Sequence, residues 1–356
     1  MTPLPPPRSP APQRILLIRL SALGDVVMAS GLIQAIKHTY PDAELSWLTE
    51  APAAPLIKHN PRLKQVLIWP RPLWRQLWQE RQWRKLWQAV MAFRNELRTN
   101  KFDLVLDAQG LLKSGVCAWF TGAPERISLM AREGSRLLVH TRLVPPPGAD
   151  RRISSEYRYL ARHLGARDED FQLDLAIGET QAAKVEQLMQ QWRHPSRLVL
   201  LCPFTTRPQK HWFEDRWAEL AQQLQSQGCF PVIVGGPADK EAAARIQAGC
   251  PGLVSVAGDL RLDDSVALVA RGQLLIGVDT GLTHMGTALK VPTLALFGST
   301  CPYADAATPH TRILYDKLDC SPCRRHPTCD GRFDCMRQLT VERVLAEAQP
   351  LLHARA

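Results

Sequence analysis

Short runs of apolar and β-branched residues recur along the chain, separated by stretches with helical periodicity. The runs are apolar throughout rather than alternating, which is typical of strands covered by helices on both faces. The expected strands span residues 14–20, 43–49, 65–69, 102–108, 197–203, 230–236, 253–258, 274–279 and 293–298. Strands that alternate with helices indicate βαβ units and therefore parallel sheets.

The strand series pauses between about residues 140 and 195, where a Pro-rich stretch and a charged helical pattern intervene. We therefore expect an α/β protein made of two Rossmann-like parallel-sheet domains facing across a cleft. The expected segments are a disordered Pro-rich tail (1–13), an N-terminal domain (14–177), a C-terminal domain (178–336) and a C-terminal helix (337–356).

The net charge of +10 favours an anionic partner, which could be nucleic acid, a membrane surface or a phosphorylated substrate. The odd count of nine cysteines argues against a secreted disulfide scaffold. The N-terminal residues have no apolar core, and no apolar run approaches the roughly 18 residues of a membrane span. These features predict a cytoplasmic protein.

Ligands of open parallel sheets bind at the carboxyl ends of the strands. After the first strand, a small turn leads to Asp25 in the first turn of a helix, where it could act as a general base or only favour the helix dipole. After the strand at 197–203, Thr205, Thr206 and Lys210 form either a phosphate-binding loop or a solvated one. After the strand at 274–279, the glycine-rich turn around Gly281 offers free N–H groups to an anion, or simply packs tightly.

Two oxyanion-binding turns in one half and a carboxylate in the other half are the layout of a sugar-nucleotide transferase. At this point the chain resembles the lipopolysaccharide heptosyltransferases of glycosyltransferase family nine. The matching segments are ILLIRLSALGDVVMASGLIQAIK, FDLVLDAQGLLKSG, TTRPQKHWFEDRWAEL, VGGPADKEAAARI and GVDTGLTHMGTALKVPTLALFGST. DAQGLLKSG and TTRPQKHW are most similar to the heptosyltransferase I branch, which adds the first heptose to Kdo–lipid A.

The resemblance implies a GT-B fold and an inverting transfer of heptose from ADP-heptose, without a metal or cofactor, to Kdo–lipid A or the first heptose of the lipopolysaccharide inner core. The N-terminal domain would bind the acceptor and hold the catalytic Asp25, and the C-terminal domain would bind the donor. The residues implied for the donor are Thr205, Thr206, Lys210, Glu241, Asp279, Thr280, Gly281 and His284. The enzyme would work at the cytoplasmic face of the inner membrane as a peripheral protein.

Residues 62–101 carry ten Lys or Arg against two Glu, and five of the ten tryptophans lie within 69–87. On a helical wheel one face holds Trp83, Leu86, Trp87, Val90 and Leu97, which we expect in the core. The roughly opposite face holds Trp74, Trp78, Arg81 and Lys85, and suits either a membrane surface or plain solvent with a helix break near residue 80. The candidate acceptor-binding residues are Arg71, Arg75, Arg81, Arg84 and Lys85.

Two further features leave alternatives open. Cys320, Cys323, Cys329 and Cys335 could hold a structural metal, form redox-sensitive disulfides or simply pack, and the heptosyltransferase I branch lacks such a cluster. The only Asp-X-Asp sequence, residues 168–170, is expected to be a solvated charge run rather than a metal site.

Rival functions are a sugar-nucleotide epimerase of GT-B fold, a transferase that uses another nucleotide sugar, and a basic nucleic-acid-binding protein. No nucleic-acid-binding motif occurs, and the basic excess is confined to one tryptophan-rich segment rather than a stripe, so nucleic acid is not expected as a partner.

Overall fold

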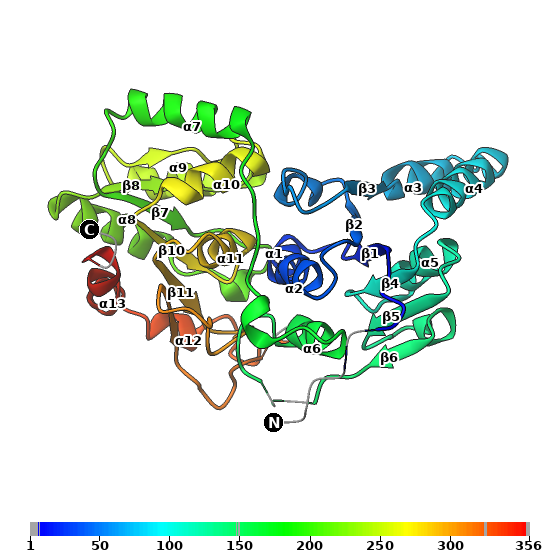
Figure 1. The fold of residues 1–356 in the computed structure, drawn as a ribbon. Helices are drawn as coiled ribbons and strands as arrows, with labels where there is room; N and C mark the ends of the chain where they lie inside the picture. Colours follow the sequence, from blue (N-terminus) through cyan, green and yellow to red (C-terminus); the bar gives the residue numbers. More distant parts are fainter. Residues whose placement is uncertain (1–5, 7, 147, 149, 324–325, 354–356) are drawn as a thin grey trace. The chain divides into compact units, whose positions relative to one another are not determined.

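The structure is a computed structural model that describes Pro6, residues 8–146, Gly148, residues 150–323 and residues 326–353. The chain forms two compact units, one of residues 1–150 and 154–176, the other of residues 151–153 and 177–356. Each unit contains one parallel six-stranded sheet with helices around it (Figure 1). Both are therefore α/β units of the kind that the apolar runs predict.

The sheet of the first unit has the strand order β3-β2-β1-β4-β5-β6. Its strands are β1 (Arg14–Ile18), β2 (Glu44–Glu50), β3 (Gln65–Trp69), β4 (Leu104–Asp107), β5 (Glu125–Leu129) and β6 (Thr141–Leu143). Its helices are α1 (Leu23–Ala29), α2 (Gly31–Thr39), α3 (Arg71–Gln79), α4 (Trp83–Thr99), α5 (Leu112–Phe120) and α6 (Ser155–His163), with 3₁₀ turns η1 (Ala54–Leu56), η2 (Ser135–Leu138) and η3 (Asp168–Asp170).

The sheet of the second unit has the order β12-β11-β10-β7-β8-β9. Its strands are β7 (Leu198–Cys202), β8 (Phe230–Ile233), β9 (Val254–Ser255), β10 (Leu274–Val278), β11 (Thr293–Phe297) and β12 (Thr311–Tyr315). Its helices are α7 (Glu179–Gln191), α8 (Glu214–Ser226), α9 (Lys240–Ala248), α10 (Leu262–Arg271), α11 (Gly281–Ala288), α12 (Asp334–Arg337) and α13 (Val341–His353), with 3₁₀ turns η4 (Pro208–Lys210) and η5 (Pro237–Asp239).

The central strands are buried on both faces, which explains why they read as unbroken apolar runs. Every residue of β7, β10 and β11 is buried, as are Ile15 to Ile18 of β1. Three strands lie outside the predicted set: β5, β6 and β12. Each is partly exposed and carries an arginine, so none forms the continuous apolar run by which the other strands are recognised.

The chain ends differ from the sequence expectation. Within the expected disordered tail, residues 1–5 and 7 lie outside the described residues, but Arg8 forms an ion pair with Glu125 and Pro12 is buried, so the expectation is wrong for residues 8–13. At the other end, α13 packs Val344, Ala348 and Leu352 into the core of the second unit. That helix is thus part of the second unit rather than a separate segment.

The two sheets share one topology, and each has a switch point where the connections run to opposite sides. The first lies between β1 and β4, the second between β7 and β10. Loops that leave the carboxyl ends of these strands meet at the switch point, which is the usual ligand site of open α/β sheets. Asp25 follows β1, and the loops with Lys210 and Asp279 follow β7 and β10.

Candidate functional site

The two loops at the second switch point are joined by an ion pair. Lys210 Nζ of η4 lies 2.5 Å from Asp279 Oδ2, which directly follows β10. His284 Nε2 lies 3.3 Å from Asp279 Oδ1. Three residues that the sequence nominates from two separate segments therefore form one charged cluster, in which Asp279 and His284 are buried and Lys210 is partly exposed.

The carboxylate of Asp279 is held in its ionised form. Burial alone would raise its pKa, but the hydrogen bond and charge of His284 and the ammonium of Lys210 outweigh burial, and the net pKa lies well below the usual value. At neutral pH this carboxylate therefore acts as a counter-ion to Lys210 and His284 rather than as a base.

The start of α11 can bind an anion. Thr280 is the N-cap residue in an extended conformation, its side chain makes no capping hydrogen bond, and the helix begins at Gly281. The first N–H groups of a helix have no intrahelical acceptor and carry a partial positive charge. By contrast, Gly277 within β10 is required by packing, because a Cβ there would lie 2.9 Å from the Cβ of Cys202.

The remaining nominated donor residues are less closely tied to this cluster. Thr205 Oγ1 donates to the carbonyl of Asp279 at 3.3 Å, so its loop is fixed to the β10 turn. Thr206 and Glu241 are exposed, Thr206 in the same loop and Glu241 in the first turn of α9. Both lie in segments that follow neighbouring strands of the same sheet, β7 and β8.

Sequence reasoning missed two residues of the cluster. Thr300 Oγ1 donates to Asp279 Oδ2, and the hydroxyl of Tyr303 lies 3.0 Å from His284 Nδ1. With the proton on Nε2, His284 donates to Asp279 and accepts from Tyr303. The signal was available, because Thr300 follows β11, the strand beside β10.

In the first unit, Asp25 has one engaged and one open carboxylate oxygen. Its Oδ2 pairs with Arg19 and accepts the N–H of Ala22 at 3.3 Å, whereas Oδ1 receives no hydrogen bond from the residues that the structure describes. The Arg19 guanidinium is fixed by a 2.9 Å hydrogen bond to the carbonyl of Ala108. Its pKa would fall through burial, but nearby acidic groups including Asp25 raise it overall. Oδ1 is thus open to accept a proton, although the position also suits the helix dipole.

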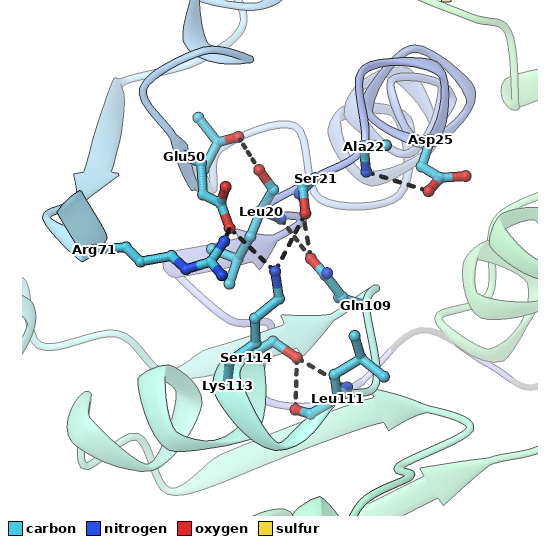
Figure 2. Close-up of polar contacts among 11 residues, drawn as sticks. Leu20, Ser21, Ala22, Asp25, Glu50, Arg71, Gln109, Leu111, Lys113 and Ser114 are labelled. Atoms are coloured by element: carbon cyan, nitrogen blue, oxygen red, sulfur yellow. Dashed lines mark hydrogen bonds and ion pairs between the residues drawn. The ribbon is translucent and has the colours of Figure 1, made fainter. Parts of the chain in front are cut away.

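Figure 2 shows how the turn before Asp25 is held. Gln109 Oε1 accepts the backbone N–H groups of Leu20 and Ser21 at 2.8 and 3.3 Å. Gln109 follows β4, so the second central strand of this sheet fixes the turn that leaves the first. The sequence segment DAQGLLKSG therefore contributes directly to the candidate base site.

The basic segment forms two helices, α3 and α4, called here the basic hairpin (residues 71–99). The predicted core face is wrong for Trp83 and Trp87, whose exposed fractions are 51% and 67%. The predicted exposed position is wrong for Trp74, which is partly buried and packs edge-on against Trp69 and Phe93. The helical conformation is interrupted at residues 80–82, and only the C-terminal half of α4 reaches the core. One helical wheel therefore does not describe the whole segment.

The exposed surface of the hairpin combines tryptophan with positive charge. Five acceptor candidates are exposed, namely Arg71, Arg75, Arg81, Arg84 and Lys85. Trp78 is 63% exposed and lies edge-on to Trp83 at 4.8 Å. Among the described helices, none is both long and apolar enough to cross a bilayer.

The four cysteines near the C-terminus, Cys320, Cys323, Cys329 and Cys335, lie close to one another. The four clustered cysteines are free thiols, and the pKa of Cys335 is raised to about 11 by burial and by the other three. No group of three or more potential metal ligands occurs among the described residues.

The Asp-X-Asp sequence forms the 3₁₀ turn η3. The expectation of a solvated charge run is wrong for Asp170, which is buried and paired with Arg167, while Asp168 pairs with Arg162.

Comparisons with known proteins agree with one another. The sequence profile of glycosyltransferase family 9 (heptosyltransferase) matches residues 90–332, more than half of the chain. Lipopolysaccharide heptosyltransferase 1 of Pseudomonas aeruginosa is 29% identical, covering 96% of this chain and 98% of its own length. Lipopolysaccharide heptosyltransferase 2 of Escherichia coli is 26% identical, with coverages of 95% and 98%.

Solved structures show the same fold. A family 9 glycosyltransferase from Veillonella parvula superposes with a TM-score of 0.80 at 19% identity, covering 96% of this chain and 97% of its own. ADP-heptose lps heptosyltransferase II of Escherichia coli gives 0.76 at 24% identity, with coverages of 96% and 99%. The two parallel sheets thus form a GT-B fold, and the chain belongs to glycosyltransferase family 9, the heptosyltransferases.

Proposed function

We propose that this protein transfers a heptose from ADP-heptose to the inner core of lipopolysaccharide, on Kdo–lipid A or the first heptose, with inversion at the anomeric carbon. The observation that carries the proposal is the cluster of Lys210, Asp279 and His284 beside the free start of α11. One ammonium and a row of backbone N–H groups are what the diphosphate of a nucleotide sugar requires.

In the proposed reaction, Asp25 Oδ1 takes the proton from an acceptor hydroxyl as that oxygen attacks the anomeric carbon. The bond from this carbon to the diphosphate breaks, and ADP leaves from the opposite face. Lys210 and the N–H groups around Thr280 and Gly281 stabilise the charge that grows on the leaving diphosphate. Because Lys210 is paired with Asp279, the diphosphate shares an ammonium that is already positioned. Thr205, Thr206 and Glu241 complete the proposed donor site.

We place the anionic acceptor, and the inner membrane surface that carries it, at the basic hairpin. Its exposed tryptophans suit the interfacial region of a bilayer, and its guanidinium groups suit phosphates. Each basic residue near an anionic surface contributes about 1 kcal/mol. The enzyme would then act at the cytoplasmic face as a peripheral protein.

The decisive experiment mixes the purified protein with ADP-heptose and Kdo–lipid A and analyses the products by mass spectrometry. Transfer adds one heptose to the acceptor and requires both substrates. Conversion of the donor without acceptor would instead indicate an epimerase. A parallel screen of other nucleotide sugars tests the donor, and activity with another donor alone would overturn ADP-heptose.

The hairpin is tested by changing Arg75, Arg81 and Lys85 to Ser, which leaves the buried Phe93 and Leu97 untouched. Binding to anionic liposomes and to Kdo–lipid A should weaken at low salt, while ADP affinity and the melting temperature stay near those of wild type. Unchanged binding to both would remove the hairpin from the acceptor site.

A further inference from the structure

A cluster of two cations and one carboxylate lies at the carboxyl edge of the first sheet. Lys113 of α5 places Nζ 3.1 Å from Glu50 Oε1 and 3.2 Å from Ser21 Oγ. Arg71, the first residue of α3, places Nη1 3.4 Å from the same Glu50 oxygen. Figure 2 shows both cations directed at this one carboxylate. The three side chains carry a net charge of plus one.

The cluster is shielded but not closed. The side chain of Glu50 is 17% exposed, that of Lys113 27% and that of Arg71 53%. Both cations also lie over the ring of the buried Trp69, each 5.8 Å from its centroid. Charges on such a half-buried surface attract an anion more strongly than fully solvated charges do, yet solute can still reach them.

The cluster adjoins the proposed base. Ser21, which contacts Lys113, precedes Ala22, and the N–H of Ala22 donates to Asp25 Oδ2. Gln109 holds the same turn through the N–H of Ser21. An anion bound by Lys113 would therefore lie beside the turn from which Asp25 acts.

We propose that Lys113 and Arg71 form a subsite for a carboxylate or phosphate of the acceptor, and that Glu50 occupies this subsite until the acceptor arrives. The inference rests on the proposed function and deepens it, because it assigns Lys113 and Glu50, which the basic hairpin does not include. Lys113 binds the anion and so positions the neighbouring hydroxyl for Asp25. Glu50 competes with that anion, and an acceptor that lacks the negative charge gains nothing by displacing it.

The competition gives two substitutions opposite effects. Lys113→Met should raise the KM for the acceptor about tenfold, the loss expected for one charge-assisted hydrogen bond, with a smaller change in kcat and unchanged ADP affinity. Glu50→Gln should lower that KM several-fold, since the competing charge is gone. If the ion pair were purely structural, the KM for the acceptor would change in the same direction in both variants, and both would lose melting temperature to the same extent.

The same strand supplies a matched control. β2 begins with Glu44, which pairs with Lys64 at 3.0 Å, and ends with Glu50. Lys64→Met and Glu44→Gln break an equivalent pair at the amino edge of the sheet and should leave the KM for the acceptor unchanged. They report the effect of losing a lysine–glutamate pair as such.

Two altered forms of deacylated Kdo–lipid A show which anionic group of the acceptor is bound. One form lacks the phosphates and keeps the sugar carboxylates, and the other keeps the phosphates and has its sugar carboxyl groups amidated. The Lys113→Met effect should vanish with whichever acceptor lacks the recognised group. Its persistence with both, an unchanged KM in Lys113→Met, or a raised KM in Glu50→Gln would each overturn the subsite. A wild-type protein that transfers heptose to none of these acceptors would overturn the proposed function instead.

Discussion

Asp25 follows β1 of the first sheet and Asp279 follows β10 of the second, and the two carboxylates have different surroundings. The side chain of Asp25 is 37% exposed and has an open Oδ1, whereas that of Asp279 is 10% exposed and has both oxygens engaged. Asp279 is fixed between Lys210 and His284, and Asp25 between Arg19 and solvent. Residue type and place in the fold are therefore insufficient to assign a role, which depends on which oxygens remain available.

The largest effect should come from Asp25→Asn. The amide keeps the shape of the side chain but cannot take up a proton, so turnover should fall by roughly two to four orders of magnitude while ADP affinity and stability remain. Steady-state kinetics with saturating donor and acceptor measure the loss. Turnover within about threefold of wild type would show that Asp25 is not the base and only stabilises α1 through the helix dipole.

Lys210→Ala should come next, with a loss of about 100-fold in the single-turnover rate and weaker ADP binding. The charge on the leaving diphosphate increases in the transition state, so the ammonium contributes more there than in the ground state. Lys184→Ala is the matched control, because Lys184 pairs with the buried Asp264 at 2.5 Å between α7 and α10. Unchanged ADP affinity in calorimetry, with an unchanged rate, would make the Lys210 loop ordinary surface.

Asp279→Asn should instead act on stability, by about 2 kcal/mol at neutral pH, because it breaks charged hydrogen bonds in a buried cluster. The lowered pKa of Asp279 sets the pH dependence. A carboxyl group with a depressed folded-state pKa stabilises the protein above its unfolded value of about 3.9, and that contribution is lost as the pH falls through the folded value. The stability difference between wild type and variant should thus narrow below about pH 4 in denaturant titrations. A difference that is independent of pH would show that the charge of Asp279 is not what stabilises the cluster.

The sequence predicts the positions of Asp25 and Asp279 in the fold, but only some of the side chains that surround them. The buried strands are recognisable as apolar runs, and the rule that ligands bind at carboxyl ends brings Lys210, Asp279 and His284 together from distant segments. The partners of the carboxylates are not recognisable, because they depend on strand order. Lys113 and Glu50 are 63 residues apart in the sequence. They meet only because Glu50 ends β2 and Lys113 follows β4, the two strands that flank β1.

The basic hairpin shows a second limit. Its helical wheel places Trp83 and Trp87 on the face of Leu97, and that geometry is correct for a single helix. Only Phe93 and Leu97 of this helix are buried in the core, so the same face is buried at one end and exposed at the other. Periodicity gives the direction of a side chain, but tertiary contacts decide what it meets.

The smallest effect is expected from chelation: transfer should proceed at an undiminished rate in excess EDTA. The two site carboxylates are paired with basic side chains, Asp25 with Arg19 and Asp279 with Lys210. In the proposed mechanism the charge on the leaving diphosphate is stabilised by an ammonium group and backbone N–H groups. The Asp-X-Asp carboxylates are likewise neutralised, Asp168 by Arg162 and Asp170 by Arg167. Initial rates with and without EDTA, followed by addition of magnesium or manganese, provide the measurement. Complete loss that either ion restores would mean that a metal carries the leaving-group charge. A partial loss accompanied by a lower melting temperature would point instead to the four clustered cysteines.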